Sequence, residues 1–457
     1  MYVYLTVFAL IPISTVHGAC SDLPIEGDGR LLCDMYSKNH DKTEAQFRIT
    51  TDPQYDEFGG PGEHGFGCES KSVTDECETL VCFCQDFVDI VDTQNGECVL
   101  PDGEKLAKAI RKEYRTLTDE ERQSFHNAMW KLKQNGDFDD IAKFYKKHAT
   151  GSASHNGPGF LPWHREFLKR VEFALRRVDH KVAIPFWDST MDSLLPNPRD
   201  SIIWTNEFMG SANGEVKSGP FAGWTTTEGG KLKRKVGAHG KAISSTDREK
   251  YLSNNDIDRA FGLISAHENE SCSYRVNGLE MEYLVGYVHQ FVGGDMEDIE
   301  AAANDPIFYL LHSFADQTWE TWRFKHQNRS QRESQYPVSR PECFLEYHNY
   351  DKVEEQDDSE KVCYDFNIKT ALSNSYTDNL YEYRLSPHCP NCGNSPYLFC
   401  HPCANKCASK IRPGGDCTSL ENTNACYKST CYNGKCVIRN KVKPALLSTQ
   451  SKYSFIV

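Results

Sequence analysis

Apolar residues recur at helical spacing in four stretches of this chain, and each stretch carries a histidine on its apolar face. The four faces are formed by Phe138, Ile141, Ala142, Tyr145 and His148; by His164, Leu168, Val171 and Leu175; by Met281, Leu284, Val285, Val288 and His289; and by Phe308, Leu311, His312, Ala315, Trp319 and Trp322. The pattern predicts four amphipathic helices that place these histidines toward a common core.

Local signals place the ends of the helical regions. Asp305 followed by Pro306 is a capping side chain with a proline in the first turn, so we expect a helix to begin there. Thr118 and Glu121 form a capping box ahead of Phe125, Ala128, Met129 and Leu132. We expect the helical pattern to begin near Glu104, to continue to about residue 180 and to return over about 279–325. Residues 190–275 are rich in Gly, Asn, Ser and charge and predict a long, loop-rich connection.

Buried imidazoles are costly unless their polar atoms are satisfied. A single histidine on an apolar face is more often a satisfied core residue than a ligand, but four such helices in one chain favour a metal site. His155 adds a fifth candidate, from a loop rich in Gly, Ser and Pro. Imidazole ligands suit copper, zinc and iron, so the pattern leaves the metal open.

Composition suggests an exported protein with flanking segments. The chain has 457 residues, and residues 1–18 have the length and small final residues of a secretory signal peptide, without a basic residue ahead of the apolar run. No other stretch is long enough to predict a membrane span. We therefore divide the chain into the signal peptide, a cysteine-containing segment 19–103, a helical domain 104–345, an acidic linker 346–387, a cysteine-rich module 388–440 and a tail 441–457.

The 19 cysteines lie outside residues 99–271, and nine of them fall between Cys389 and Cys436. In an oxidising compartment this density predicts disulfide bonds. Cys389-x-x-Cys392 with Cys400-x-x-Cys403 leaves a zinc site as the alternative. The odd total predicts one cysteine that is free or bonded to another chain, and Asn269 and Asn328 begin glycosylation patterns.

The net charge of −14 argues against nucleic acid as a partner and is compatible with an acidic, solvated surface. The basic stretch from Lys231 to Lys235 is expected to be an exposed loop.

Two long motifs resemble the copper-binding signatures of tyrosinases. The first is His155-Asn-Gly-Pro-Gly-Phe160-Leu-Pro-Trp163-His164-Arg165, and the second joins His289-Gln-Phe-Val-Gly293-Gly294 to Asn304-Asp305-Pro306-Ile-Phe308-Tyr-Leu-Leu-His312-Ser-Phe-Ala-Asp316. The resemblance covers about residues 105–345 and implies a mainly α fold, in which a four-helix bundle with long loops holds two copper ions. The disulfide-rich flanks resemble those of secreted molluscan tyrosinase-like proteins, some of them from shell matrix.

The resemblance implies His148, His155 and His164 as ligands of one copper and His289 and His312 as ligands of the other. The third ligand of the second copper is missing, because Val285 stands where the family has histidine and Gly286 follows where it has asparagine. His267, on a polar stretch upstream, is a poor substitute. By the same resemblance, Arg165 and Asp316 are candidates to orient ligands, with simple salt bridges as the alternative. Phe160, Trp163, Phe308 and Trp319 are candidate walls of the pocket, with core packing as the alternative.

The implied activity is oxidation of phenols or o-diphenols to o-quinones with dioxygen. Small phenols or tyrosine residues of matrix proteins would be the substrates, for pigmentation or for cross-linking of an extracellular matrix or shell. The loss of a ligand at Val285 supports a second hypothesis, a catalytically impaired matrix protein that keeps the fold. A dioxygen carrier of the hemocyanin type is a third. Neither nucleic acid nor a membrane is an expected partner.

Overall fold

The computed structural model describes residues 77–88, 97–149, 154–155, 157–261, 278–337 and 368–438. Several predicted features lie outside these residues: the signal peptide, His267, the acceptor at Asn269, the acidic stretch 351–361 and the tail 441–457. The helices are α2 (Leu80–Phe83), α3 (Asp119–Asn135), α4 (Asp137–Ala149), α5 (Phe160–Val178), α6 (Thr190–Ser193), α7 (Ser245–Ser253), α8 (Ile257–Ala260), α9 (Met281–Val292), α10 (Pro306–His326), α11 (Arg329–Ser334) and α12 (Ile368–Ala371). The strands are β1 (Ala109–Arg111), β2 (Asn213–Glu215), β3 (Lys233–Lys235), β4 (Tyr381–Tyr383), β5 (Leu398–His401), β6 (Lys406–Ser409), β7 (Thr430–Tyr432) and β8 (Lys435–Val437).

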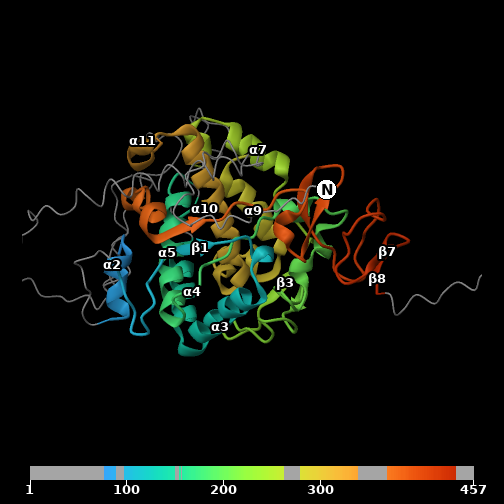
Figure 1. Ribbon diagram of the computed structural model, residues 1–457, viewed down its shortest axis with the longest axis horizontal. Helices are drawn as coiled ribbons and strands as arrows, with labels where there is room; N and C mark the ends of the chain where they lie inside the picture. Colours follow the sequence, from blue (N-terminus) through green and yellow to red (C-terminus); the bar gives the residue numbers. More distant parts are fainter. Residues whose placement is uncertain are drawn as a thin grey trace, which may run out of the picture.

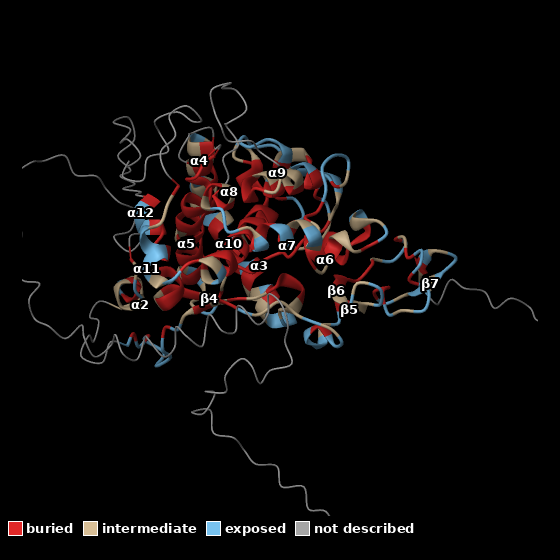
Figure 2. Cartoon of the chain, turned by 90° about the horizontal axis from the view of Figure 1, so that it is seen from above, coloured by how far each residue is buried: buried red, intermediate tan, exposed pale blue. Residues whose placement is uncertain are grey.

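Helix α10 runs through the middle of the fold, and every residue from Pro306 to Arg323 is buried. It packs against α5, α7 and α9, and α5 in turn packs against α3 (Figure 1). Aromatic contacts bring α4 to the same core, since the Tyr145 ring lies 4.7 Å from Phe308 on α10. The buried residues concentrate on these helices (Figure 2). The predicted mainly α fold with a four-helix bundle, here α4, α5, α9 and α10, is confirmed.

The expected helix ends are present where the sequence places them. Thr118 and Glu121 form a complete capping box at the start of α3. The Asp305 carboxylate accepts from the Ile307 N–H, and Pro306 occupies the first turn of α10. The expectation of helix near Glu104 is wrong, because β1 occupies residues 109–111 and the first helix of the bundle region begins only at Asp119.

Strand β1 pairs in parallel with β4, in the register Ala109 with Tyr381 and Arg111 with Tyr383. Tyr376, Tyr381 and Tyr383 are fully buried. The prediction of a linker from 346 to 387 is therefore wrong for its described part, since residues 368–383 complete the core. Their aromatic side chains supply apolar area that a solvated linker would leave in water.

The long connection between α5 and α9 is loop-rich, as predicted, with short helices and one small hairpin. Strand β3 alternates two exposed lysines, Lys233 and Lys235, with the buried Arg234. The Arg234 guanidinium binds both oxygens of the Asp305 carboxylate, at 2.6 and 2.7 Å. The basic stretch is thus anchored to the start of α10 and is not a free loop.

The cysteine-rich module contains four disulfides, 389–400, 392–407, 417–431 and 426–436. Cys389, Cys392 and Cys400 are all disulfide-bonded, which leaves only Cys403 free, so the disulfide prediction holds for the two C-x-x-C pairs rather than the zinc alternative. The module packs against the helical domain. Ile411 forms an antiparallel β-bridge with Ser201, and the Arg412 guanidinium pairs with the Asp200 carboxylate at 2.9 Å.

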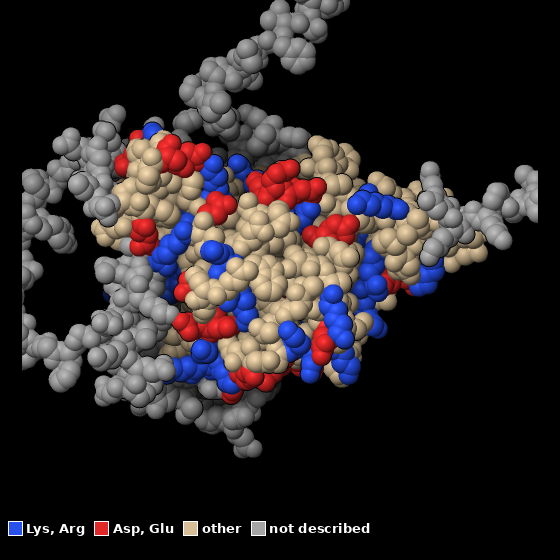
Figure 3. Space-filling view, turned by 90° about the horizontal axis from the view of Figure 1, so that it is seen from below, with Lys and Arg blue, Asp and Glu red and all other residues tan. Residues whose placement is uncertain are grey.

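Charged residues of both signs are interspersed on the face shown in Figure 3. Basic and acidic side chains often pair there and elsewhere on the surface, as Lys406 does with Glu249. Within the described residues, no helix combines the length and the apolar character that crossing a membrane requires.

Candidate metal centre

Four of the five candidate histidines form one continuous cluster in the bundle. The rings of His164 on α5 and His312 on α10 stack with centroids 4.2 Å apart. His155 lies 5.1 Å from His164, and His289 on α9 lies 5.5 Å from His312. The four rings therefore follow one another in the order His155, His164, His312 and His289.

Hydrogen bonds from the surroundings fix the ring orientations. His164 Nδ1 lies 2.8 Å from the Phe160 carbonyl, and His289 Nδ1 lies 2.9 Å from the Met296 carbonyl. A carbonyl only accepts, so each Nδ1 carries the proton and each Nε2 keeps its lone pair. His155 Nδ1 is held by the Ser154 hydroxyl at 3.0 Å.

His155, His164 and His312 are buried, His289 is partly buried, and all four imidazoles are neutral at pH 7. Burial, opposed by a hydrogen bond to Met296, lowers the pKa of His289 to about 4. Burial and the neighbouring His289 lower the pKa of His155 to about 3. The pKa values of His164 and His312 lie well below the usual range for the same two kinds of cause, burial first and then nearby histidines. Neutral imidazole is the form that binds a metal ion.

Two observations test whether a metal ion fits. His164 Nε2 is buried without a hydrogen-bond partner. His289 Nε2 and His312 Nε2 lie 3.2 Å apart. Two nitrogens bound to one ion at about 2.0–2.1 Å, at a tetrahedral angle, would be separated by about 3.3 Å. This donor set fits a metal ion, although no three histidines among the described residues bring their ring nitrogens within 4.8 Å of one another.

His148 occupies a different environment. It lies in the last turn of α4 and is half-buried, with its ring 4.4 Å from Phe144 and 6.4 Å from Trp163. The side chain of α4 that touches the cluster is Tyr145, whose hydroxyl lies 3.3 Å from His155 Nε2. Tyr145 could not be recognised from the sequence, where it reads only as part of an apolar face.

Residue 285 is the position at which the sequence predicts a missing copper ligand. Val285 is 2% exposed, on the same helix as His289, and offers no donor atom. The next residue, Gly286, is exposed, and a Cβ at Gly286 would meet no atom within 4 Å. A larger side chain at residue 286 is therefore not excluded by packing.

Three of the four predicted wall residues do contact the histidines. Phe160 lies 4.5 Å from His164, Phe308 lies 4.2 Å from His312, and Trp163 lies 5.0 Å from His164, all between ring centroids. Trp319 does not line the cluster: its ring packs between the guanidinium groups of Arg165 and Arg323, at 4.1 and 4.9 Å.

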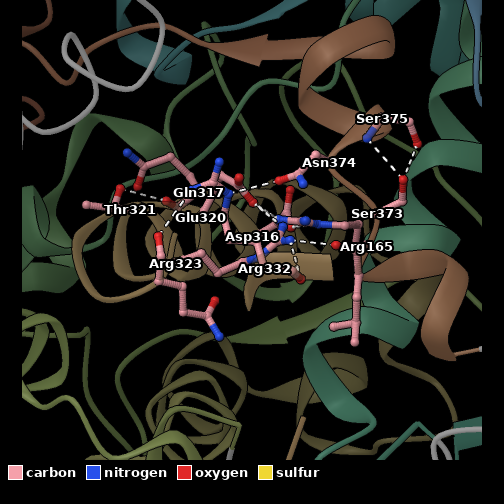
Figure 4. Close-up of polar contacts among 12 residues, drawn as sticks. Arg165, Asp316, Gln317, Glu320, Thr321, Arg323, Arg332, Ser373, Asn374 and Ser375 are labelled. Atoms are coloured by element: carbon pink, nitrogen blue, oxygen red, sulfur yellow. Dashed lines mark hydrogen bonds and ion pairs between the residues drawn. The ribbon is translucent and has the colours of Figure 1, made fainter. Parts of the chain in front are cut away.

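Arg165 and Asp316 belong to a buried ionic cluster. Figure 4 shows these side chains grouped with Glu320, Arg323 and Arg332. Arg165 Nε lies 2.7 Å from Asp316 Oδ1, and Arg165 also binds Glu320. Among the described residues neither Arg165 nor Asp316 hydrogen-bonds a histidine of the centre.

The ionic cluster also holds the C-terminal part of the chain. Asp316 accepts from the hydroxyls of Tyr381 and Tyr383, at 2.7 and 2.6 Å. Arg111 binds Glu172 through two nitrogens, both at 3.0 Å. The Arg165 and Asp316 side chains thus join helices α5 and α10 to strand β4, and the salt-bridge alternative fits their contacts.

Comparison with known proteins gives the class of the fold. A family model described as the common central domain of tyrosinase matches residues 120–325. A tyrosinase of Streptomyces antibioticus is 31% identical over 240 residues, which cover 48% of this chain and 84% of that protein. The chain belongs to the tyrosinase family.

Two animal relatives extend the similarity beyond the central domain. Tyrosinase-like protein tyr-3 of Caenorhabditis elegans is 39% identical over 450 residues, which cover 95% of this chain and 62% of that protein. Tyrosinase-like protein 2 of the mollusc Margaritifera margaritifera is 28% identical over 339 residues, which cover 67% of this chain and 68% of that protein. The chain thus spans less than two thirds of the length of its nematode relative.

Proposed function

We propose that this protein is a copper oxidoreductase of the tyrosinase type that oxidises phenols or o-diphenols to o-quinones with dioxygen. The observation that carries the proposal is the His289–His312 pair, whose Nε2 atoms lie 3.2 Å apart, with the His312 ring stacked on His164. His155 and His164 would hold one copper, with His148 as the third ligand expected from the sequence, and His289 and His312 would hold the other.

Copper, when bound, supplies the exchange of electrons with dioxygen and the phenolic substrate. The protein's part is to hold the ligands and to exclude water. The carbonyls of Phe160 and Met296 fix two ring orientations, so little rearrangement is needed on binding. The apolar rings of Phe160 and Phe308 pack against His164 and His312 and keep water from these imidazoles.

A second candidate function is a catalytically impaired matrix protein that retains the fold. Val285 favours it, because a copper held by two imidazoles is bound more weakly and has a changed potential. The protonation state of the histidines does not distinguish the two functions, because neutral imidazoles are compatible with an active enzyme and with an impaired matrix protein.

We further propose that the protein acts outside the cell, on phenols or on tyrosine residues of matrix proteins. The N-terminal apolar run, the disulfides of the cysteine-rich module and the likeness to molluscan tyrosinase-like proteins support this location. Of the two glycosylation patterns, Asn328 is exposed at the start of α11, where a glycan would be accessible to solvent.

The test is copper content and catechol oxidation of the purified, secreted protein, measured side by side with a Val285→His variant. About two tightly bound coppers and oxidation of catechol by the natural chain would support the oxidoreductase. One copper or none, with activity only after Val285→His, would support the impaired matrix protein. His401→Gln is the control, because it removes an imidazole of the cysteine-rich module whose Nδ1 accepts a hydrogen bond from the Ala404 N–H.

A further inference from the structure

A cleft separate from the histidine centre lies between helix α3 and the connection that joins α5 to α9. Its volume is about 520 Å³, within the range of about 300–1,000 Å³ that is typical of small-molecule sites. The residues that line the cleft are Asp119, Arg122, Gln123, His126, Trp130, Asn206, Glu207 and Pro220. None of these residues belongs to the histidine centre, and the proposed oxidation gives the cleft no role.

His126 presents one buried hydrogen-bond donor to the cleft. The residue is 4% exposed, and its Nε2 lies 2.5 Å from the Tyr114 hydroxyl. Burial raises the pKa of the Tyr114 phenol well above its ordinary value, so this hydroxyl keeps its proton and donates it to Nε2. His126 Nδ1 therefore carries the ring proton, and no group among the described residues accepts it. This N–H is available to an acceptor on a ligand.

The charged groups that line the cleft are already paired. The Arg122 guanidinium binds the Asp119 carboxylate, and the Glu207 carboxylate pairs with Lys428 at 3.5 Å. Burial and the nearby Arg122 guanidinium lower the pKa of His126 to about 3, so its ring is uncharged at pH 7. Because no charge of the lining lacks an opposite charge, the cleft is complementary to an uncharged ligand.

The remaining hydrogen-bonding groups are of both kinds, and they surround an apolar surface. Both hydrogen bonds of the Asp119 carboxylate go to Oδ1, which leaves Oδ2 as an acceptor. The exposed Asn206 amide makes no hydrogen bond to a described residue, so it can donate and accept. The half-buried Trp130 indole donates its N–H to the Pro220 carbonyl at 2.6 Å, so its ring offers only carbon surface to the cleft.

We propose that this cleft binds a neutral sugar ring. A pyranose ring has C–H groups on its faces, which pack on an aromatic ring, and hydroxyl groups around its edge, which both donate and accept. The Trp130 indole would contact the face of the sugar, and His126 Nδ1, Asp119 Oδ2 and the Asn206 amide would bind its hydroxyls. The site adds a binding activity to the proposed function, since it would hold the protein on a neutral polysaccharide.

The experiment measures sugar binding to the full-length protein, as purified, by titration calorimetry. The probe is cellobiose, a neutral disaccharide, and the charged comparison is the matching disaccharide of glucosamine, whose amines are cationic. The variants are Trp130→Leu and Asn206→Ala. Their matched controls are Tyr432→Leu, at an exposed aromatic residue of the cysteine-rich module, and Asn213→Ala, at an exposed asparagine of β2.

We expect cellobiose to bind at a single site and more tightly than the glucosamine disaccharide. Asn206→Ala should weaken binding roughly fivefold, through the loss of a hydrogen bond. Trp130→Leu should weaken binding about tenfold, through the loss of the aromatic face. Both controls should match the natural chain. Because Trp130 also packs on Trp224, Asn206→Ala at an exposed residue keeps the test decisive if Trp130→Leu fails to fold.

The proposal is wrong if cellobiose does not bind, or if it binds the natural chain and both cleft variants equally well. It is also wrong if the glucosamine disaccharide binds more tightly than cellobiose, since the cleft would then be a cation site formed by Asp119 and Glu207. None of these measurements depends on copper or on catechol oxidation, so the proposed function is tested separately.

Discussion

Helices α5 and α10 carry two buried polar regions of opposite character within one turn of each other. The histidine centre contains His164 and His312. The ionic cluster contains Arg165, the next residue on α5, and Asp316, one turn later on α10. In the ionic cluster each charge faces an opposite charge, and the Arg165 and Arg323 guanidinium groups, against the effect of burial, bring the pKa of Glu320 to about 2. In the histidine centre the imidazoles are neutral, and His164 Nε2 has no hydrogen-bond partner.

This difference distinguishes the side chains of the ionic cluster, which stabilise the fold, from those of the histidine centre, which are arranged to bind a ligand. Ionised side chains persist in the interior only when they are paired, and in the ionic cluster Arg165 is paired with both Asp316 and Glu320, although Arg165 Nη1 and Glu320 Oε1 make no hydrogen bond. The imidazoles of the histidine centre form no ion pair among the described residues, and His164 Nε2 has no hydrogen-bond partner there. Their burial becomes favourable when a metal ion takes the lone pairs.

The largest effect is expected from a comparison of two neighbouring residues of α5, Arg165 and His164, each replaced in turn. Arg165→Met should lower the free energy of unfolding by about 3–5 kcal/mol, because it leaves Asp316 and Glu320 buried near each other without their shared cation. His164→Gln should cost about 1 kcal/mol. Urea unfolding of the metal-free proteins measures both. Equal losses would contradict the assignment of separate roles.

Copper should stabilise the natural chain and do so through the histidine centre. A metal ion at a hundred times its dissociation constant adds about 2.7 kcal/mol to the free energy of unfolding. The gain should fall in His312→Gln, disappear when His164 and His312 are both replaced by Gln, and persist in a charge variant at the surface, Glu249→Gln. Thermal unfolding with and without copper gives the result, and an undiminished gain in the double variant would place the copper elsewhere.

The two regions should also differ in their response to acid. The folded pKa of His155 is about 3, below the ordinary value of 6.5, so the unfolded chain takes up its proton first. Stability from this group is complete above pH 6.5 and is lost as the pH falls from 6.5 toward 3. Glu320, with a folded pKa of about 2 and an ordinary value of 4.5, loses its contribution only below pH 4.5.

The metal-free natural chain should therefore lose about 1 kcal/mol more than His155→Gln between pH 7 and pH 5.5. Glu320→Gln should leave that difference between the two pH values unchanged. Urea unfolding at both pH values is the measurement, and equal losses in the natural chain and His155→Gln would show that His155 binds its proton as readily in the folded as in the unfolded chain.

The smallest effect concerns ring orientation. Ser154→Ala removes the hydroxyl that holds His155 Nδ1 at 3.0 Å and should weaken copper binding by about 1 kcal/mol, roughly fivefold. Ser334→Ala, at the exposed end of α11, is the matched control. Chelator competition measures the change, and no difference would mean that the loop backbone alone orients His155.

The helical faces could be predicted because apolar spacing reports directly on which side of a helix is buried. Asp305 with Pro306, and Thr118 with Glu121, fixed two helix starts in the same local way. The pairing of β1 with β4 could not be found, because residues 109 and 381 are joined only by tertiary contacts. Aromatic residues such as Tyr381 in a short polar context carry no periodicity that would indicate burial.

Within the site, the same limit separates the histidines from Tyr145. Spacing placed His164, His289 and His312 on the apolar faces of their helices, and the structure brings these three rings together. On α4 both Tyr145 and His148 continue the stripe, and only the packing of α4 against α5 and α10 decides which one meets His155. For Trp319 the core-packing alternative fits, because a stripe of apolar residues does not tell whether its buried side faces the histidines or the arginines.

The pairing of β1 with β4 has a consequence for proteolytic processing. A cut anywhere between residues 337 and 368 would divide the chain, yet Tyr381 and Tyr383 would still be bonded to Asp316, and Arg323 to the Leu372 carbonyl. The two fragments would stay together as a nicked, two-chain protein through electrophoresis without denaturant and separate only when unfolded. Maturation by such a cut would leave the C-terminal piece in place.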